Sequence, residues 1–188
     1  MTETPKTDEE LAKQTQNGNT ESFGELVARF EKKLTRYAKK FLFDYSEAED
    51  LVQEVFLKAY QNIQSFDVKR SFNAWIYRIA HNLFINEIKR KGKEPLPFFD
   101  PDTLFPHPVD NHKADDEVKE KELKEMMDKC LSKLKPNYRE AMVLYYYEDL
   151  DYQKISDVLQ IPVSTVGVRL NRAKKELREI YLKLYQPA

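Results

Sequence analysis

Five prolines fall within fifteen residues of this chain, and they restrict its possible folds more than any other feature: Pro95, Pro97, Pro101, Pro106 and Pro108. Each proline removes a backbone donor and keeps the residue before it out of the helical region. The sequence therefore predicts two bodies joined by an extended linker over residues 94–115. The apolar side chains of this linker would lie either in a groove of a larger partner or on the chain's own helices: Phe98, Phe99, Leu104 and Phe105.

Apolar residues before the linker recur at steps of three and four, which is typical of amphipathic helices. One such stripe begins near Glu21 and ends at Phe41. A second begins at Ser46, which forms a capping-box pattern with Glu49 and predicts a helix to Ile63. After a polar loop at residues 65–70, a third stripe runs from Phe72 to Ile88, and a weaker helix is expected around residues 9–14.

Composition agrees with a helical chain. Only 4 of the 188 residues are glycine, and no alternating runs of β-branched residues occur between turn signals. With 41% hydrophobic and 34% charged residues, the chain can bury a core beneath a heavily charged surface. We therefore predict an all-α protein with domains at residues 1–93 and 116–188.

Near the C-terminus, the spacing predicts a helix-turn-helix. Ile155, Val158 and Leu159 share one helical face, and Pro162 prevents that helix from continuing. A second apolar stripe then begins at Val166. The opposite face of this second helix is mainly basic, as expected of a recognition helix in a major groove, and carries Arg169, Arg172, Lys174, Lys175 and Arg178.

Charge is sorted along the chain although the net charge is only −1. Residues 78–93 hold five basic side chains and one acidic, whereas residues 94–125 hold ten acidic and four basic. Two basic patches thus flank an acidic connector, which indicates phosphate-facing surfaces. Ordinary solvated faces are the alternative reading of these charges alone.

An enzyme is poorly supported. His107, His112 and Cys130 match no compact zinc motif, and no phosphate-binding glycine loop or nucleophile elbow occurs. We expect no catalytic residue, metal or cofactor. One cysteine and the lack of a long apolar run predict a cytoplasmic protein that does not insert into a membrane.

Three segments, in order, resemble the extracytoplasmic-function sigma factors of the sigma-70 superfamily. Residues 50–60 are similar to the family's polymerase-binding helix, and residues 72–82 to its promoter-melting segment. Residues 131–140, followed by the helix-turn-helix, are similar to its C-terminal promoter-binding domain. The resemblance implies two small helical domains, like sigma-70 regions 2 and 4, that direct core RNA polymerase to promoters and promote DNA opening.

The family's first domain docks on the beta-prime clamp helices of the polymerase, and its second meets the beta flap. By resemblance, the polymerase-binding residues are Asp50, Gln53, Glu54, Phe56, Leu57 and Lys58. Polar residues beside apolar area suit a helix that binds a partner. An anti-sigma factor that covers these faces is a further partner implied by the resemblance.

Opening the minus-10 region requires surfaces that replace base stacking. Phe66, Phe72, Trp75 and Tyr77 surround the polar loop, although the spacing of Trp75 favours packing over base contact. By resemblance, the residues that contact the minus-10 DNA are Phe66, Asp67, Lys69, Arg78, Asn82, Asn86, Lys89 and Arg90.

The second domain is expected to read the minus-35 duplex. Its candidate residues are Ser164, Thr165, Val168, Arg169, Asn171, Arg172 and Lys175. Two positions depart from the family pattern: Gly167 replaces the usual lysine or arginine, and Val168 replaces a small hydroxyl residue. Both put the recognised upstream sequence in question.

A stand-alone helix-turn-helix regulator is the alternative function. Such a protein would bind duplex DNA unaided, whereas a sigma factor binds specifically with core polymerase. The aromatic-rich loop and Asn82 favour the sigma factor, because a pure duplex reader has no need for them.

Overall fold

The computed structural model describes residues 5–42, 48–90 and 114–185, with only the backbone described for residues 114–121. The described residues form helices and no strand, which confirms the all-α prediction. The helices are α1 (Asp8–Gln16), α2 (Thr20–Leu42), α3 (Ala48–Asn62), the 3-10 turn η1 (Ile63–Ser65), α4 (Phe72–Arg90), α5 (Ala114–Ser132), α6 (Pro136–Tyr146), α7 (Tyr152–Leu159) and α8 (Val163–Tyr185). Ser46 of the predicted capping box and residues 94–113 of the predicted linker lie outside the described residues. Residues 114 and 115, also predicted as linker, form the start of α5.

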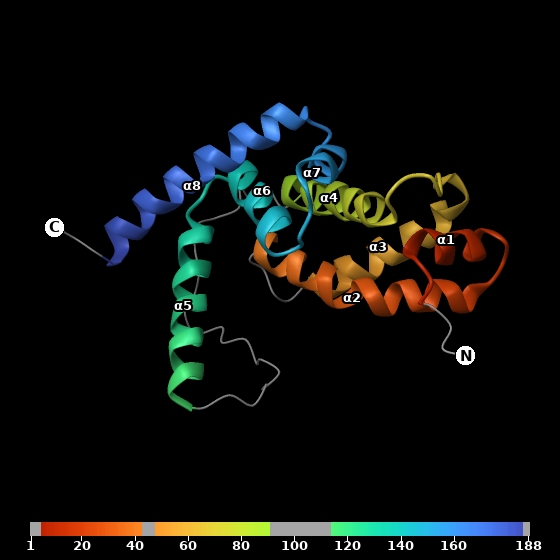
Figure 1. The fold of residues 1–188 in the computed structure, drawn as a ribbon, viewed down its shortest axis with the longest axis horizontal. Coiled ribbons are helices and arrows are strands. Elements are labelled where there is room, and N and C mark those ends of the chain that lie inside the picture. Colours follow the sequence, from red (N-terminus) through yellow and green to blue (C-terminus); the bar gives the residue numbers. More distant parts are fainter. Residues whose placement is uncertain (1–4, 43–47, 91–113, 186–188) are drawn as a thin grey trace.

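Helices α1 to α4 form the first domain, on the side of the N-terminus in Figure 1. The expected stripe of α2 is buried from Leu26 to Phe41 and packs against α1, α3 and α4. Helix α1 begins with a capping box in which the Thr7 hydroxyl accepts from the Glu10 amide and the Glu10 carboxylate accepts from the Thr7 amide. This short helix is therefore well defined, although its sequence signal is weak.

Helices α5 to α8 form the second domain. Pro136 opens α6, since a first-turn residue needs no backbone donor. Asp151 caps α7 by accepting from the Lys154 amide at 2.8 Å. The helix ends at Gln160 in the left-handed conformation (φ 53°), and Pro162 then accepts the first bonds of α8. The predicted helix-turn-helix is present as α7 and α8.

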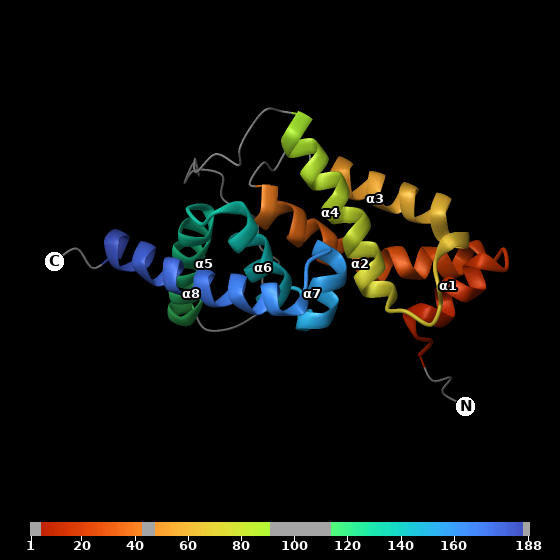
Figure 2. The ribbon, with the colours of Figure 1, turned by 90° about the horizontal axis from the view of Figure 1, so that it is seen from above.

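The two domains lie against each other. Helix α4 packs on α7, and α2 packs on α6 (Figures 1 and 2). Buried apolar residues of both domains belong to one connected core, which runs from Leu11 to Ala173. The linker pattern predicted two bodies; the contact between them is a result of the tertiary structure.

Candidate nucleic-acid and protein interfaces

One side of α4 presents polar and basic residues to solvent. Arg78, Asn82 and Asn86 are exposed at steps of four, so they form a single stripe along the helix. Lys89 continues it, and Arg90 pairs with Glu87 through two bonds of 2.7 and 2.8 Å. Exposed amides and cations on one stripe suit unpaired bases and phosphates.

The loop before α4 is anchored by α1. The Gln16 amide donates to the carbonyls of Ile63 and Phe66, each at 2.8 Å, and Glu9 accepts from the Phe72 amide at 2.9 Å. These bonds fix both ends of the loop, so its tip stays in solvent. Sequence reasoning missed this role of α1, because neither residue belongs to a recognisable motif.

At the tip, Asp67 and Lys69 are both exposed. The Asp67 carboxylate accepts from the Lys69 amide at 3.0 Å, and its carbonyl accepts from the Arg70 amide at 2.9 Å. This local turn holds the two predicted minus-10 side chains at the end of α4.

The aromatic residues around this loop are mainly core. Phe66 is only 4% exposed, and the centroid of its ring lies 5.4 Å from that of Phe72 and 5.1 Å from that of Trp75. Tyr77 is fully buried on another side of α4. The rings of Phe66, Phe72 and Tyr77 are packed in the core, so in this structure they are not exposed to stack on bases. The contact of Phe66 with minus-10 DNA stays a prediction. Trp75 is half-buried against the core, as its spacing predicted.

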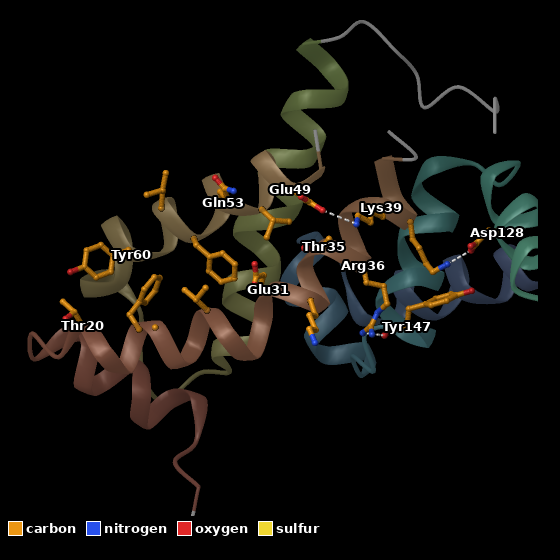
Figure 3. Close-up of a pocket in the computed structure, with 18 of the residues that line it drawn as sticks. Thr20, Glu31, Thr35, Arg36, Lys39, Glu49, Gln53, Tyr60, Asp128 and Tyr147 are labelled. Atoms are coloured by element: carbon orange, nitrogen blue, oxygen red, sulfur yellow. Dashed lines mark hydrogen bonds and ion pairs between the residues drawn. The ribbon is translucent and has the colours of Figure 1, made fainter. Parts of the chain in front are cut away.

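Helix α3 borders a groove of about 1320 Å³ between itself and α2 (Figure 3). Phe23, Val27, Val52, Phe56 and Leu57 supply apolar lining, and Leu57 is 62% exposed. The groove reaches the second domain at Lys124, Asp128 and Tyr147.

The predicted polymerase-binding residues divide around this groove. Gln53, Phe56 and Leu57 line it, with Phe56 nearly buried. Asp50 and Glu54 are exposed on the same helix, and Lys58 pairs with Glu54 at 3.5 Å. An apolar floor with a charged edge has the composition of a protein interface.

The recognition helix α8 buries Val166, Leu170 and Ala173 and leaves the opposite face in solvent. On that face are the exposed residues Ser164, Val168, Asn171, Arg172 and Lys175. Thr165 and Arg169 are half-buried at its margins. The structure thus brings the predicted minus-35 residues onto one surface, with no cover from the other described helices over its centre.

Two family models match this chain in the order of its domains. Sigma-70 region 2 matches residues 26–94, and Sigma-70 region 4 matches residues 124–177. The chain is 35% identical over 175 residues to the ECF RNA polymerase sigma factor SigW of Bacillus subtilis (strain 168), covering 89% of this chain and 92% of that protein. The chain belongs to the extracytoplasmic-function sigma factors of the sigma-70 family.

Other relatives agree. The chain is 31% identical over 182 residues to the ECF RNA polymerase sigma-E factor of Haemophilus influenzae, covering 90% of this chain and 92% of that protein. It also resembles the structure of CnrH in complex with the cytosolic domain of CnrY, with TM-score 0.69, 27% identity, and coverage of 92% and 96% of the two chains. As a sigma factor, this protein directs RNA polymerase to promoters.

In this sigma factor, buried polar side chains join the two domains. Glu148, between α6 and α7, accepts two bonds of 2.8 Å from the Arg36 guanidinium on α2. Its Oε2 also accepts from the Tyr77 hydroxyl on α4 at 2.5 Å. One carboxylate therefore ties both long helices of the first domain to the second.

A second carboxylate does the same nearby. Glu140 Oε1 accepts from the Tyr37 hydroxyl and contacts His81 Nδ1, each at 2.6 Å. Lys40 of α2 pairs with Asp128 of α5 and lies 4.5 Å over the Tyr147 ring. We call these residues the seam: Arg36, Tyr37, Lys40, Tyr77, His81, Asp128, Glu140, Tyr147 and Glu148.

Burial perturbs the ionisable groups of the seam. It raises the pKa of Glu148, against the opposing effect of Arg36 and Tyr77. It also raises the pKa of Tyr37 and Tyr77, with a further contribution from the adjacent carboxylates, and that of Tyr147 to about 12. The Arg36 pKa is raised mainly by its hydrogen bonds to Glu148.

Sequence reasoning did not identify the seam as an interface. Tyr37 sits on the apolar stripe of α2, a spacing that predicts a core residue, and Glu148 follows three tyrosines without a motif. Pairing such residues requires knowing which helices meet.

Two absences concern only the part of the chain that the structure describes. Within residues 5–42, 48–90 and 114–185, no group of His, Cys, Asp and Glu side chains is arranged to hold a metal ion. In the same ranges, no helix has the length and apolar character needed to span a membrane. His107 and His112 lie outside them.

Proposed function

We propose that residues 1–93 bind core RNA polymerase and the minus-10 DNA, while residues 116–188 bind the minus-35 duplex, with residues 94–115 as the linker. One observation carries this assignment: the exposed surfaces of α3, α4 and α8 are distinct and follow the order of the two family matches. The proposal gives each predicted set of residues its own ligand.

The polymerase surface would be the groove between α2 and α3 together with the exposed edge of α3. Leu57, Tyr60 and the half-buried Phe23 offer apolar area beside Asp50 and Glu54. We expect a helical element of the polymerase clamp to lie here, since such a groove accepts one face of a helix. Phosphodiester chemistry would remain with the polymerase.

The minus-10 surface would be the stripe of α4 with the loop tip. Asn82 and Asn86 can donate to and accept from base edges that unpairing exposes, while Arg78, Lys69 and Lys89 neutralise phosphates. Since Phe66 is buried, base capture on this surface would depend more on hydrogen bonds than on stacking by that ring.

Simultaneous contact with both promoter elements would require the domains to part. About 25 base pairs separate the elements, which is about 85 Å of B-DNA. A compact chain of this length has a radius of gyration of about 16 Å and a diameter of about 40 Å. The packing of α4 on α7 would therefore be a state of the free protein, and the seam would open when polymerase and promoter bind.

An anti-sigma factor is a proposed partner of the same faces. One structural neighbour is the sigma factor RpoE with the anti-sigma factor NepR from Bartonella quintana, with TM-score 0.68; at 23% identity it supports the fold alone. The CnrH complex, at 27% identity, supports a protein partner more directly. We propose that the protein works in the cytoplasm, where it would meet the polymerase.

The decisive test is run-off transcription with core polymerase on a library of randomised promoters. We expect selected templates to share two elements, and Asn82→Ala to abolish most transcripts while core binding persists. Asn137→Ala, a change of an exposed asparagine on α6, is the matched control and should leave transcription intact. Sequence-specific binding to duplex DNA without polymerase would instead favour a stand-alone regulator.

A further inference from the structure

The centre of the exposed face of α8 is a valine. On an ideal helix of about 100° per residue, Val168 lies within about 15° of the direction opposite to Val166, Leu170 and Ala173. Those three side chains are buried, and Val168 is 46% exposed. A helix inserted in a groove by its exposed face would therefore direct Val168 at the base edges.

The neighbours of Val168 on this face are polar. Ser164 precedes it by four residues, and Asn171 and Arg172 follow by three and four, all exposed. Gly167 adds no side chain beside it, and the Tyr152 ring lies 3.5 Å from where a Cβ at Gly167 would be. The side chain at the centre of the exposed face of α8 is thus the isopropyl group of Val168. Residues with hydrogen-bonding groups lie before it and after it along the helix.

An isopropyl group cannot donate or accept a hydrogen bond. Among the groups that base pairs present in the major groove, the thymine C5-methyl is the apolar one. Placing Val168 opposite a guanine or cytosine edge would leave polar atoms without partners, which is unfavourable.

We propose that Val168 reads a thymine in the upstream promoter element through its C5-methyl group. The inference rests on the proposed minus-35 role of α8 and specifies its chemistry. Asn171 and Arg172 would contact the flanking base pairs or phosphates. Because Gly167 lacks the basic side chain that is usual in the family, the apolar contact of Val168 would be a main determinant of base choice.

The test replaces each thymine of the selected upstream element, one at a time, with deoxyuridine, which lacks only the methyl group. Affinity of the holoenzyme for each duplex is measured by equilibrium filter binding. Removing a buried methyl should weaken binding of the unmodified protein about fourfold at one position. In Val168→Ser the same replacement should have no effect, because the apolar partner is gone.

Val163→Ser is the matched control. Val163 is also exposed, at 38%, yet lies at the start of α8 about 140° from Val168 around the helix axis. This variant should retain the fourfold response to deoxyuridine. Circular dichroism of both variants checks that α8 is intact.

The inference is overturned if no thymine responds to loss of its methyl, if the response persists in Val168→Ser, or if the selected element contains no thymine. Arg172→Ala separates this failure from failure of the minus-35 assignment. If that variant weakens binding to the upstream element while deoxyuridine has no effect, only the methyl contact is wrong. If neither change matters, the minus-35 assignment of α8 is wrong as well.

Discussion

Helices α4 and α8 carry the residues proposed to contact DNA, and the rest of the chain holds them differently. Helix α8 buries one stripe within its own domain and leaves its other face in solvent. Helix α4 exposes one stripe, but its Tyr77 and His81 are bonded to carboxylates of the other domain. The exposed face of α8 is thus formed by one domain alone, whereas α4 is held in position by contacts from both domains.

The side chains of the seam are polar or charged. Arg36 is 45% exposed although its partner Glu148 is buried, and Lys40 and Asp128 are nearly buried. Charged and hydroxyl groups regain water when they separate, so parting them costs less than exposing the same area of apolar core. We infer that polar contacts across the seam confer orientation more than strength.

The largest effect is expected at alkaline pH, which should destabilise the protein through the buried tyrosines of the seam and leave the exposed face of α8 unaffected. Folding raises the pKa of Tyr37, Tyr77 and Tyr147 above the unfolded value of about 10. Their contribution to the free energy of unfolding is therefore fully present below about pH 10 and is lost as the pH rises further. Stability should fall by about 1.4 kcal/mol per tyrosine per pH unit. Chemical denaturation at about pH 9 and 11 tests this. Tyr77→Phe should reduce the fall in the free energy of unfolding per pH unit by about one third. An unchanged fall would contradict the role of burial.

Loss of Glu148 should act next most strongly. Glu148→Ala removes the partner of Tyr77 and of the half-exposed Arg36, which should cost about 3 kcal/mol. Small-angle scattering should show a larger radius of gyration as the domains part. Glu179→Ala removes an exposed carboxylate of α8 and should leave both measurements unchanged. Equal effects of the two variants would mean that Glu148 does not hold the seam.

Tyr37→Phe removes one hydroxyl without creating a cavity. The buried Glu140 carboxylate would lose the hydrogen bond that the Tyr37 hydroxyl donates, at a cost of about 2 kcal/mol, while His81 still contacts it. Tyr60→Phe on the exposed side of α3 is the control and should change stability by less than about 0.5 kcal/mol. Thermal unfolding of both proteins measures the difference; a neutral Tyr37→Phe would show that this bond adds nothing.

The smallest changes in stability should follow from substitutions in α8 and in the turn before it, because these residues are not part of the seam. Gln160 ends α7 with φ 53°, a conformation that glycine adopts freely, so Gln160→Gly should stabilise the protein by about 1 kcal/mol.

Gly167→Ala should add up to about 1 kcal/mol of helix propensity, since its Cβ would meet Tyr152 only at ordinary contact distance. Denaturant midpoints measure both. Destabilisation by either would mean that the turn or the Tyr152 packing is tighter than its geometry indicates.

Most helices were predictable because their signals are local. The stripe of α2, the proline that opens α6 and the Asp151 cap of α7 each depend on residues within a few positions. The face of α8 followed from the same periodicity. The loop before α4 was only partly predictable: Asp67 and Lys69 are exposed, but Phe66 is buried because its ring packs against Phe72 and Trp75 of α4.

The sequence by itself determined which segments are helical and which face of each is apolar, because both follow from spacings of three and four residues. The order of the polymerase-binding and DNA-binding surfaces came from its resemblance to the sigma-factor family, which the family matches confirm. Only the tertiary structure decided that Tyr77 and His81 of α4 meet Glu148 and Glu140 across the seam. Those partners lie 71 and 59 positions apart. Hydrogen bonds over such separations depend on how two finished domains dock, and no local pattern encodes that geometry.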